Sequence, residues 1–93
     1  MASDQQERYT VLLERQAEKS LQRLPREVLG RVDRLILALA GDPRPAGCKK
    51  LKGYESLYRV RVGDWRVVYA VEDDRLIVLV IEIAPRGQAY RDL

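Results

Sequence analysis

The sequence predicts an α+β fold in which an N-terminal strand and a helical hairpin pack on a largely antiparallel four-stranded sheet. Two observations support this fold class. Apolar residues recur with the period of an α-helix only between residues 15 and 40. Residues 57–83 instead contain three successive stretches with the character of β-strands, separated by turn residues. Together with a short β-rich stretch before the helices, this order of elements is typical of the α+β class.

Length and composition limit the organisation of the chain. With 93 residues, of which 46% are hydrophobic and 33% charged, the protein can bury one modest core and is not intrinsically disordered. We therefore expect residues 1–93 to form a single domain. We expect the polar residues 1–7 to be disordered, and the chain to end in a short C-terminal tail or helix.

The N-terminal half of the chain provides the first strand and the helical hairpin. Tyr9 to Leu13 is short and β-rich, and from Glu14 the apolar period changes to that of a helix. Pro25 interrupts this pattern and suits the start of a second helix, which we expect to continue to Ala40. The apolar stripe of the two helices consists of Ala17, Leu21, Leu24, Val28, Val32, Leu35, Ile36 and Leu39.

The stretch from Leu57 to Tyr69 predicts a β-hairpin that reverses at Gly63-Asp64. Because successive side chains of a strand point to opposite faces, the hairpin has two unlike faces. One face carries Arg59, Arg61 and Arg66, with Arg61 directly opposite Arg66. The other face carries the residues that we expect in the core, namely Tyr58, Val60, Val62, Trp65, Val67 and Tyr69.

Three arginines on one face of a hairpin favour an anionic partner. Like charges opposite each other destabilise a strand pair by about 0.2–1 kcal/mol, and a bound polyanion such as nucleic acid removes that cost. The alternative is a solvated outer face, since antiparallel sheets often have one wet face. The stretch 49–66 holds six basic residues against two acidic ones. Its lysines, Lys49, Lys50 and Lys52, are either phosphate contacts that bind RNA or part of an exposed loop.

The last predicted strand runs from Leu76 to Ile83 and is nearly continuous in β-branched residues. Such a run is typical of a central strand that is buried on both faces. If helices cover only one face, the apolar residues of the other are available to a partner. Arg86 and Tyr90 then follow at the end of the sheet.

Several classes of protein are excluded by what the sequence lacks. It has one cysteine, Cys48, and no histidine, which excludes an intramolecular disulfide and Cys-rich zinc sites and means that any catalysis proceeds without imidazole. We expect no metal and no cofactor. The N-terminus has no signal peptide, and the longest apolar runs are too short to span a membrane. We therefore expect a cytoplasmic protein without membrane association.

The motifs in the second half of the chain resemble those of the RelE/ParE superfamily of bacterial toxins, and those of RelE most closely. They are basic-Leu-basic-Gly at 50–53, Tyr-Arg-x-Arg at 58–61, Gly-Asp-aromatic-Arg-x-x-Tyr at 63–69, and the final Arg86 and Tyr90. With the helical hairpin, the likeness covers nearly the whole chain. It implies a toxin of a type II toxin–antitoxin system that cuts mRNA in the ribosomal A site, with the RNA 2′-hydroxyl as nucleophile.

The resemblance also implies partners and site residues. A cognate antitoxin silences such a toxin, and operator DNA is bound only through the toxin–antitoxin complex. The residues that match catalytic positions are Arg59, Arg61, Arg66, Arg86 and Tyr90. Relatives often have lysine at the first two positions, and many have histidine where this chain has Pro85. Two alternatives therefore stay open: a ParE-type inhibitor of DNA gyrase, and a catalytically impaired toxin that acts as corepressor with its antitoxin.

Overall fold

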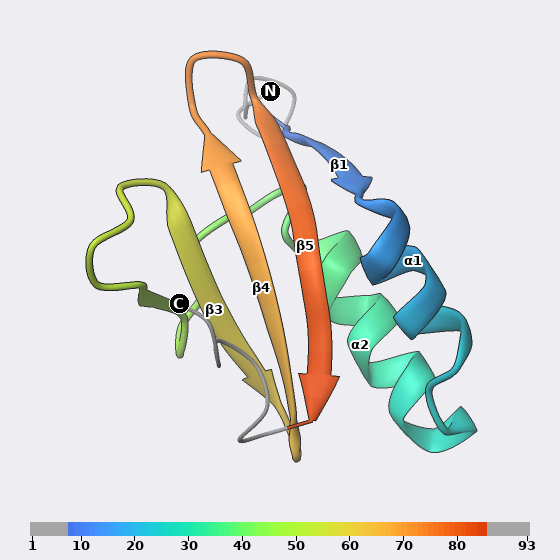
Figure 1. Ribbon diagram of the computed structural model, residues 1–93. Helices are drawn as coiled ribbons and strands as arrows, with labels where there is room; N and C mark the ends of the chain where they lie inside the picture. The colour runs from blue at the N-terminus through green and yellow to red at the C-terminus, as the bar shows by residue number, and fades with distance from the viewer. Residues whose placement is uncertain (1–7, 86–93) are drawn as a thin grey trace.

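The computed structural model describes residues 8–85, which form two helices and a five-stranded mixed sheet. The elements are β1 (Thr10–Leu13), α1 (Arg15–Gln22), α2 (Arg26–Ala38), β2 (Lys49–Lys50), β3 (Leu57–Val62), β4 (Trp65–Glu72) and β5 (Ile77–Pro85). Both helices lie on one face of the sheet, and the other face is open (Figure 1). No helix in this part of the chain is long and apolar enough to cross a membrane.

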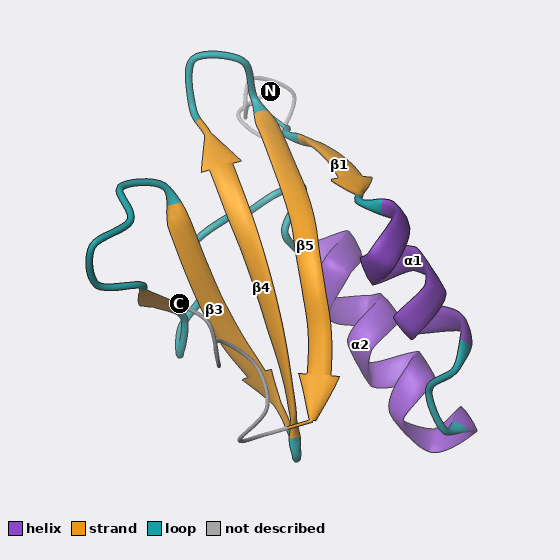
Figure 2. Cartoon of the chain, in the orientation of Figure 1, coloured by secondary structure: helices purple, strands orange, loops and turns teal. Residues whose placement is uncertain are grey.

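The strand order β1-β5-β4-β3-β2 confirms the α+β arrangement and corrects the number of strands (Figure 2). The fifth strand is β2, whose Lys49 and Lys50 pair with Arg59 and Tyr58 at the edge of the sheet. A two-residue strand of exposed lysines has no apolar alternation, so the sequence pattern alone favoured a four-stranded sheet. Among the strands within residues 8–85, β1 and β5 pair in parallel and the other neighbouring strands pair antiparallel.

The predicted helical stripe is the surface that packs on the sheet. Ala17, Leu24, Val32, Ile36 and Leu39 are buried in the main core, and the other predicted stripe residues pack against it. The second helix begins directly after Pro25 and ends at Ala38, two residues before the predicted end. Burying this stripe is what holds two short helices in place, since helices of this length are marginal alone.

The central hairpin has the predicted register throughout. Arg61 is opposite Arg66, Arg59 is opposite Val68, and the chain reverses at Gly63, whose φ is +61°. Only glycine adopts this conformation easily. A Cβ atom at Gly63 would also lie 3.2 Å from Nη1 of Arg31, which shows that the Arg31 side chain of α2 lies against this turn.

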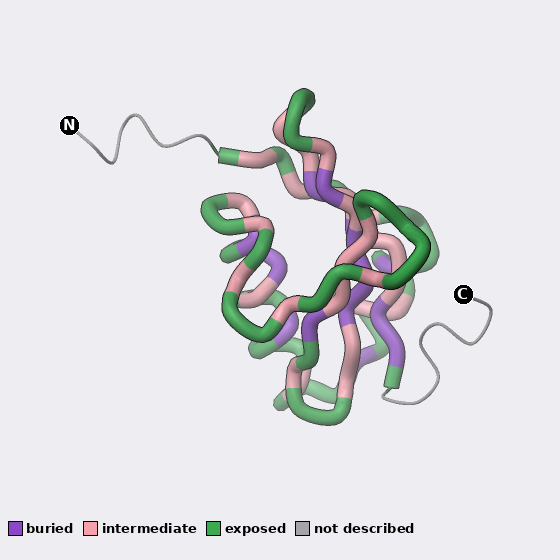
Figure 3. Tube along the Cα trace, turned by 90° about the vertical axis from the view of Figure 1, so that its left-hand side faces the viewer, coloured by how far each residue is buried: buried purple, intermediate pink, exposed green. Residues whose placement is uncertain are grey.

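Strand β5 is central, but only one of its faces is fully buried. Val78 and Val80 are inaccessible, whereas Ile77, Leu79 and Ile81 are half-exposed on the strand. The prediction that this strand is buried on both faces was therefore wrong, because the helices cover one side of the sheet only. Figure 3 shows the buried segments concentrated where the helices meet the sheet.

A β-bulge in β5 decides which side chains reach the open face. Val68 is opposite Glu82 and Tyr69 is opposite Val80, so Ile81 is the extra residue. Ile83 is consequently turned into the main core. Without the bulge, strict alternation from Val80 would point Glu82 into that core; with it, the carboxylate lies on the open face.

Candidate functional site

Four basic side chains from β2, β3 and β4 converge on the open face of the sheet. They line a recess of about 190 Å³, which we call the arginine pocket. Its lining residues are Gly47, Lys49, Arg59, Val60, Arg61 and Arg66. The register explains this convergence, because Arg59 is flanked by Lys49 on one side and Arg61 is paired with Arg66 on the other strand. Three predicted catalytic residues and one predicted RNA-binding lysine thus lie together.

The arginines of the pocket differ in their exposure. Arg61 is exposed, whereas Arg59 and Arg66 are half-buried and the Nε atom of Arg66 is buried. A small apolar cluster of Val68, Ala84 and Leu51 lies on the same face of the sheet. Half-burial restricts the rotamers of a long side chain, so these guanidinium groups are better positioned than surface arginines. None of the described residues that line the pocket is acidic.

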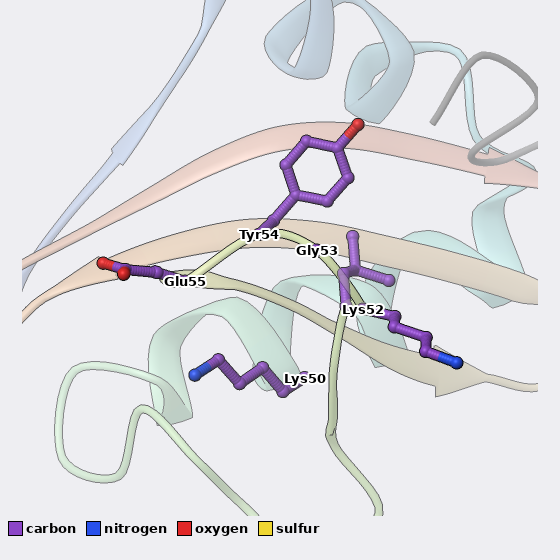
Figure 4. Close-up of a pocket in the computed structure, with 6 residues that line it drawn as sticks. Lys50, Lys52, Gly53, Tyr54 and Glu55 are labelled. Carbon is purple, nitrogen blue, oxygen red and sulfur yellow. The ribbon is translucent and has the colours of Figure 1, made fainter.

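The predicted lysine trio is divided between two neighbouring recesses. Lys49 lines the arginine pocket, while Lys50 and Lys52 line a wider recess of about 500 Å³ in the loop between β2 and β3 (Figure 4). The other lining residues of this second recess are Leu51, Gly53, Tyr54 and Glu55. The two recesses are near each other, because Leu51 of the second recess packs on Val68, which lies opposite Arg59 of the arginine pocket.

The remaining predicted residues have different outcomes. Arg86 and Tyr90 lie outside the described residues. Tyr58, Trp65 and Tyr69 belong to the main core or pack against it, which confirms their structural assignment. Within residues 8–85, no three or more His, Cys, Asp or Glu side chains group in a way that could hold a metal ion.

Glu82 lies on the open face near the arginine pocket, a position that the sequence pattern did not reveal. The bulge places it in one row with Val68 and Arg59 across the open face. A carboxylate therefore lies one strand away from Arg66 on the same face. The available signal was one acidic residue within an otherwise apolar β-branched run, which indicates that this position is turned out of the core.

A second polar cluster, which the sequence analysis did not predict, surrounds Arg44 near the β4–β5 turn. Arg44 forms a bidentate ion pair with Asp73, with Nη2–Oδ2 2.7 Å and Nη1–Oδ1 3.2 Å. Arg44 Nε donates to the Tyr58 hydroxyl at 3.0 Å, and Tyr9 donates its hydroxyl to Asp73 Oδ1 at 2.6 Å. We call these four residues the Arg44 cluster; it ties the start of the chain, the α2–β2 loop and the β4–β5 turn together.

Aromatic packing extends the Arg44 cluster into the core. The Arg44 guanidinium carbon lies 5.1 Å from the centroid of the Tyr58 ring, within cation–π distance. The Tyr58 ring in turn stacks on Tyr69 with centroids 5.9 Å apart. The Tyr69 hydroxyl donates to the Pro43 carbonyl at 2.9 Å, so this buried ring also fixes the loop that carries Arg44.

The titration of the Arg44 cluster follows from these contacts. Hydrogen bonds from Arg44 and then Tyr9 lower the pKa of Asp73 below its usual value. The hydrogen bond to Asp73 raises the pKa of Tyr9, and burial is the main cause of the raised pKa of Tyr69. Asp73 and Tyr58 together raise the pKa of Arg44. In this cluster the charge of Arg44 is neutralised by Asp73, and the contacts connect segments of the fold. We therefore interpret the cluster as structural rather than as a binding site.

Comparison with known proteins relates this arrangement to one family of toxins. The family model of the ParE toxin of the type II toxin–antitoxin system parDE matches residues 11–90. The chain is 34% identical to RelE1 of Methanocaldococcus jannaschii over 88 residues, which is 91% of this chain and 98% of that protein. It is also 34% identical to the toxin RelE of Mycobacterium tuberculosis over 84 residues, 89% of this chain and 87% of the relative.

Solved structures share the fold over most of the chain. The archaeal RelE–RelB complex from Pyrococcus horikoshii contains a chain with a TM-score of 0.77 and 34% identity, covering 87% of this chain and 98% of that one. The RelBE2 toxin–antitoxin complex of M. tuberculosis gives a TM-score of 0.74 at 25% identity, covering 85% and 99%. The isolated E. coli RelE toxin, at 23% identity and a TM-score of 0.76 over 88% of each chain, shares the fold.

Proposed function

Because this chain belongs to the RelE/ParE superfamily of toxins of type II toxin–antitoxin systems, we propose that it is a ribosome-dependent mRNA endonuclease that inhibits translation. The observation that carries this proposal is the arginine pocket. Arg59, Arg61, Arg66 and Lys49 line one recess, and in the part of the chain that the structure describes no acidic residue lines it with them. That arrangement suits a phosphate of an RNA strand better than it suits a solvated outer face.

In the proposed reaction the RNA 2′-hydroxyl attacks the adjacent phosphate. The O2′–P bond forms, the P–O5′ bond breaks, and the products are a 2′,3′-cyclic phosphate and a 5′-hydroxyl. Negative charge develops on the phosphate oxygens, where Arg61 and Arg66 donate charge-assisted hydrogen bonds. Guanidinium groups suit this task because they stay charged and can bind two oxygens at once.

The same properties prevent the arginines from acting as the base, because a guanidinium group does not lose its proton in proteins. Glu82 lies on the open face in the row of Arg59 and one strand from Arg66. A carboxylate there can accept the proton of the attacking 2′-hydroxyl. Arg86 and Tyr90, which follow β5 directly in sequence, remain proposed as the residues that supply the leaving-group proton and orient the base.

A cognate antitoxin is the proposed protein partner in the cytoplasm. The similar structures include the archaeal RelE–RelB complex of P. horikoshii and the RelBE2 toxin–antitoxin complex of M. tuberculosis. The half-exposed side chains Ile77, Leu79 and Ile81 of β5, together with the 46% exposed Leu12 of β1, leave apolar surface for such a partner. Operator DNA is bound only by the toxin–antitoxin complex in this proposal.

The proposal is tested by induced expression and by cutting of mRNA on programmed ribosomes. Arg61→Ala should remove both growth arrest and mRNA cleavage, because an exposed arginine can be truncated without disturbing the core. Arg34→Ala, which removes an exposed arginine from α2 on the other side of the sheet, is the matched control and should leave both unchanged. Equal toxicity of a folded Arg61→Ala variant would refute the proposed activity.

A second candidate function is inhibition of DNA gyrase, because the matching family model is that of the ParE toxin. The two functions differ in their first effect on the cell. Induction of a gyrase inhibitor causes a DNA-damage response while mRNA stays intact, whereas an mRNA endonuclease produces cleaved transcripts without direct DNA damage.

A further inference from the structure

The recess beside the arginine pocket is lined by Tyr54, the one tyrosine within residues 8–85 whose hydroxyl group has no described hydrogen bond. The hydroxyl groups of Tyr9, Tyr58 and Tyr69 all have partners within residues 8–85. Tyr54 is 39% exposed and belongs to neither apolar cluster. A tyrosine that is exposed and lies outside both apolar clusters is more typical of a contact residue than of a core residue.

The loop that carries Tyr54 is anchored at its base. Leu51 packs on Val68 and Ala84 and donates its backbone N–H to Leu57 O at 2.8 Å. Tyr54 N–H donates to Leu51 O at 3.2 Å, and Gly53 allows this turn with φ of +85°. The ring is therefore presented at a defined place on the open side of the sheet.

Charges surround the ring unequally. In Figure 4 the Tyr54 ring projects from the loop, and the side chains of Lys52 and Glu55 extend to opposite sides of it. Lys50 also lines the recess, and in Figure 4 its side chain extends toward the side on which Glu55 lies, whereas Lys52 extends the other way. The recess therefore has a lysine on each side of the ring, and its net positive charge attracts the phosphates of an approaching nucleic acid strand.

An exposed aromatic ring flanked by lysines is the combination that binds single-stranded nucleic acid, in which bases stack on rings and lysines hold the backbone. The location also fits, because Leu51 lines this recess and packs on Val68, which lies opposite Arg59 of the arginine pocket. A strand whose phosphate lies at the arginines thus passes this recess with a neighbouring nucleotide.

We propose that Tyr54 stacks on a nucleobase that flanks the scissile phosphate, with Lys50 and Lys52 binding the backbone of that nucleotide. This subsite deepens the proposed mRNA endonuclease function and rests on it for the identity of the strand. Stacking is tolerant of sequence, so the subsite contributes binding and register more than a choice between bases.

The first test compares cleavage by Tyr54 variants on programmed ribosomes. Tyr54→Ala should lower kcat/KM about ten- to a hundredfold, mainly through KM, while Tyr54→Phe and Tyr54→Trp should retain it because the ring stays. Leu37→Ala, which removes a 63% exposed apolar side chain from α2, is the control and should cut normally. Wild-type cutting by Tyr54→Ala, or equal losses in the Phe and Trp variants, would overturn the proposal.

The second test locates the stacked base with mRNAs that carry one abasic nucleotide on either side of the cut. At the position that Tyr54 contacts, removal of the base should lower wild-type cleavage, and Tyr54→Ala should then cause no further loss. A loss from Tyr54→Ala that is the same for every abasic mRNA would show that the ring does not contact a base.

A third measurement separates this proposal from the proposed function. A 2′-O-methylated RNA hexanucleotide with a single 2-aminopurine cannot be cut, and its fluorescence is quenched when the base stacks. Quenching by wild-type protein and by Tyr54→Phe, but not by Tyr54→Ala, supports the subsite even if mRNA is not cleaved. Cleavage without such quenching, or a Tyr54→Ala variant that only loses binding of the antitoxin, would refute the subsite and leave the endonuclease standing.

Discussion

The Arg44 cluster and the arginine pocket both contain arginine, but the arginines have different surroundings in the two places. In the Arg44 cluster one arginine is bound by Asp73 through two hydrogen bonds and is covered on one side by the Tyr58 ring. In the arginine pocket Arg59, Arg61 and Arg66 gather with Lys49 around a recess that no acidic residue between residues 8 and 85 lines. The first cluster pairs one arginine with one carboxylate, whereas the second gathers several cations around one recess, which is the arrangement that we propose binds a phosphate.

The difference shows that the environment of an arginine, rather than its presence, indicates its role. Arg44 and Asp73 belong to separate loops, and their pairing closes these loops together. The pocket arginines belong to one hairpin, whose register forces like charges side by side at a cost in stability. A fold that keeps such a cost is best explained by binding of an anion, and each of the following predictions tests that contrast.

The strongest test of this contrast is to replace one arginine in the pocket and one in the Arg44 cluster and to compare the two variants. Arg66→Ala should lower mRNA cleavage about 100- to 1000-fold, because it removes a donor to the charge that develops on the phosphate. Arg44→Ala should lower the melting temperature and leave cleavage unchanged, because its partners are internal. Single-turnover cutting on ribosomes and thermal unfolding measure the two effects. If both variants lost the same activity, the clusters would not differ in role.

The hairpin of this site was predictable because its geometry is local. Alternation and the Gly63-Asp64 turn fix that Arg61 faces Arg66, and no tertiary information is needed. The fold class and the helical stripe were predictable for the same reason, since each depends on a period within one segment.

The missed residues depend on contacts between distant segments. Arg44 pairs with Asp73 across 29 residues, and nothing in either local sequence announces the other. Glu82 reaches the open face only because of the bulge at Ile81, which reverses the alternation of the strand. The two-residue strand β2 could not be predicted from the period of apolar residues either, because it is defined by its pairing with β3 alone.

Glu82 provides a further test of the comparison, because this carboxylate lies in register with Arg59 across β4. Glu82→Gln should lower kcat about tenfold or more if the carboxylate accepts the 2′-hydroxyl proton. KM should fall at the same time, because a negative charge near the bound phosphate is removed. A variant with lower KM and unchanged kcat would show that Glu82 repels RNA without taking part in proton transfer.

Tyr69 tests the structural half of the contrast. Tyr69→Phe removes the hydroxyl that binds the Pro43 carbonyl and should reduce the free energy of unfolding by about 0.5–1.5 kcal/mol. Cleavage should be unaffected, since Tyr69 lies in the core on the face opposite to the pocket. Chemical denaturation and cleavage by the same preparation measure both quantities, and loss of cleavage at full stability would contradict the assignment.

The smallest expected effect is the pH dependence of the Arg44 cluster. Hydrogen bonds from Arg44 and Tyr9 lower the pKa of Asp73 in the folded state, so the unfolded chain binds the proton more readily in acid. The stabilisation by Asp73 is therefore fully present above the unfolded pKa of about 3.9 and is lost as the pH falls through the lower folded value. Asp73→Asn should be less stable than the wild type at neutral pH, and this difference should shrink at about pH 3 or below.

The exposure of this ion pair adds a second signature. The side chains of Arg44 and Asp73 are 39% and 58% exposed, so added salt should screen their attraction and reduce the difference between wild type and Asp73→Asn at neutral pH. Urea unfolding at two pH values and two salt concentrations measures both dependences. A difference that stayed constant across pH would mean that Asp73 acts through packing or backbone geometry, and the Arg44 cluster could then no longer be described as an arginine neutralised from within.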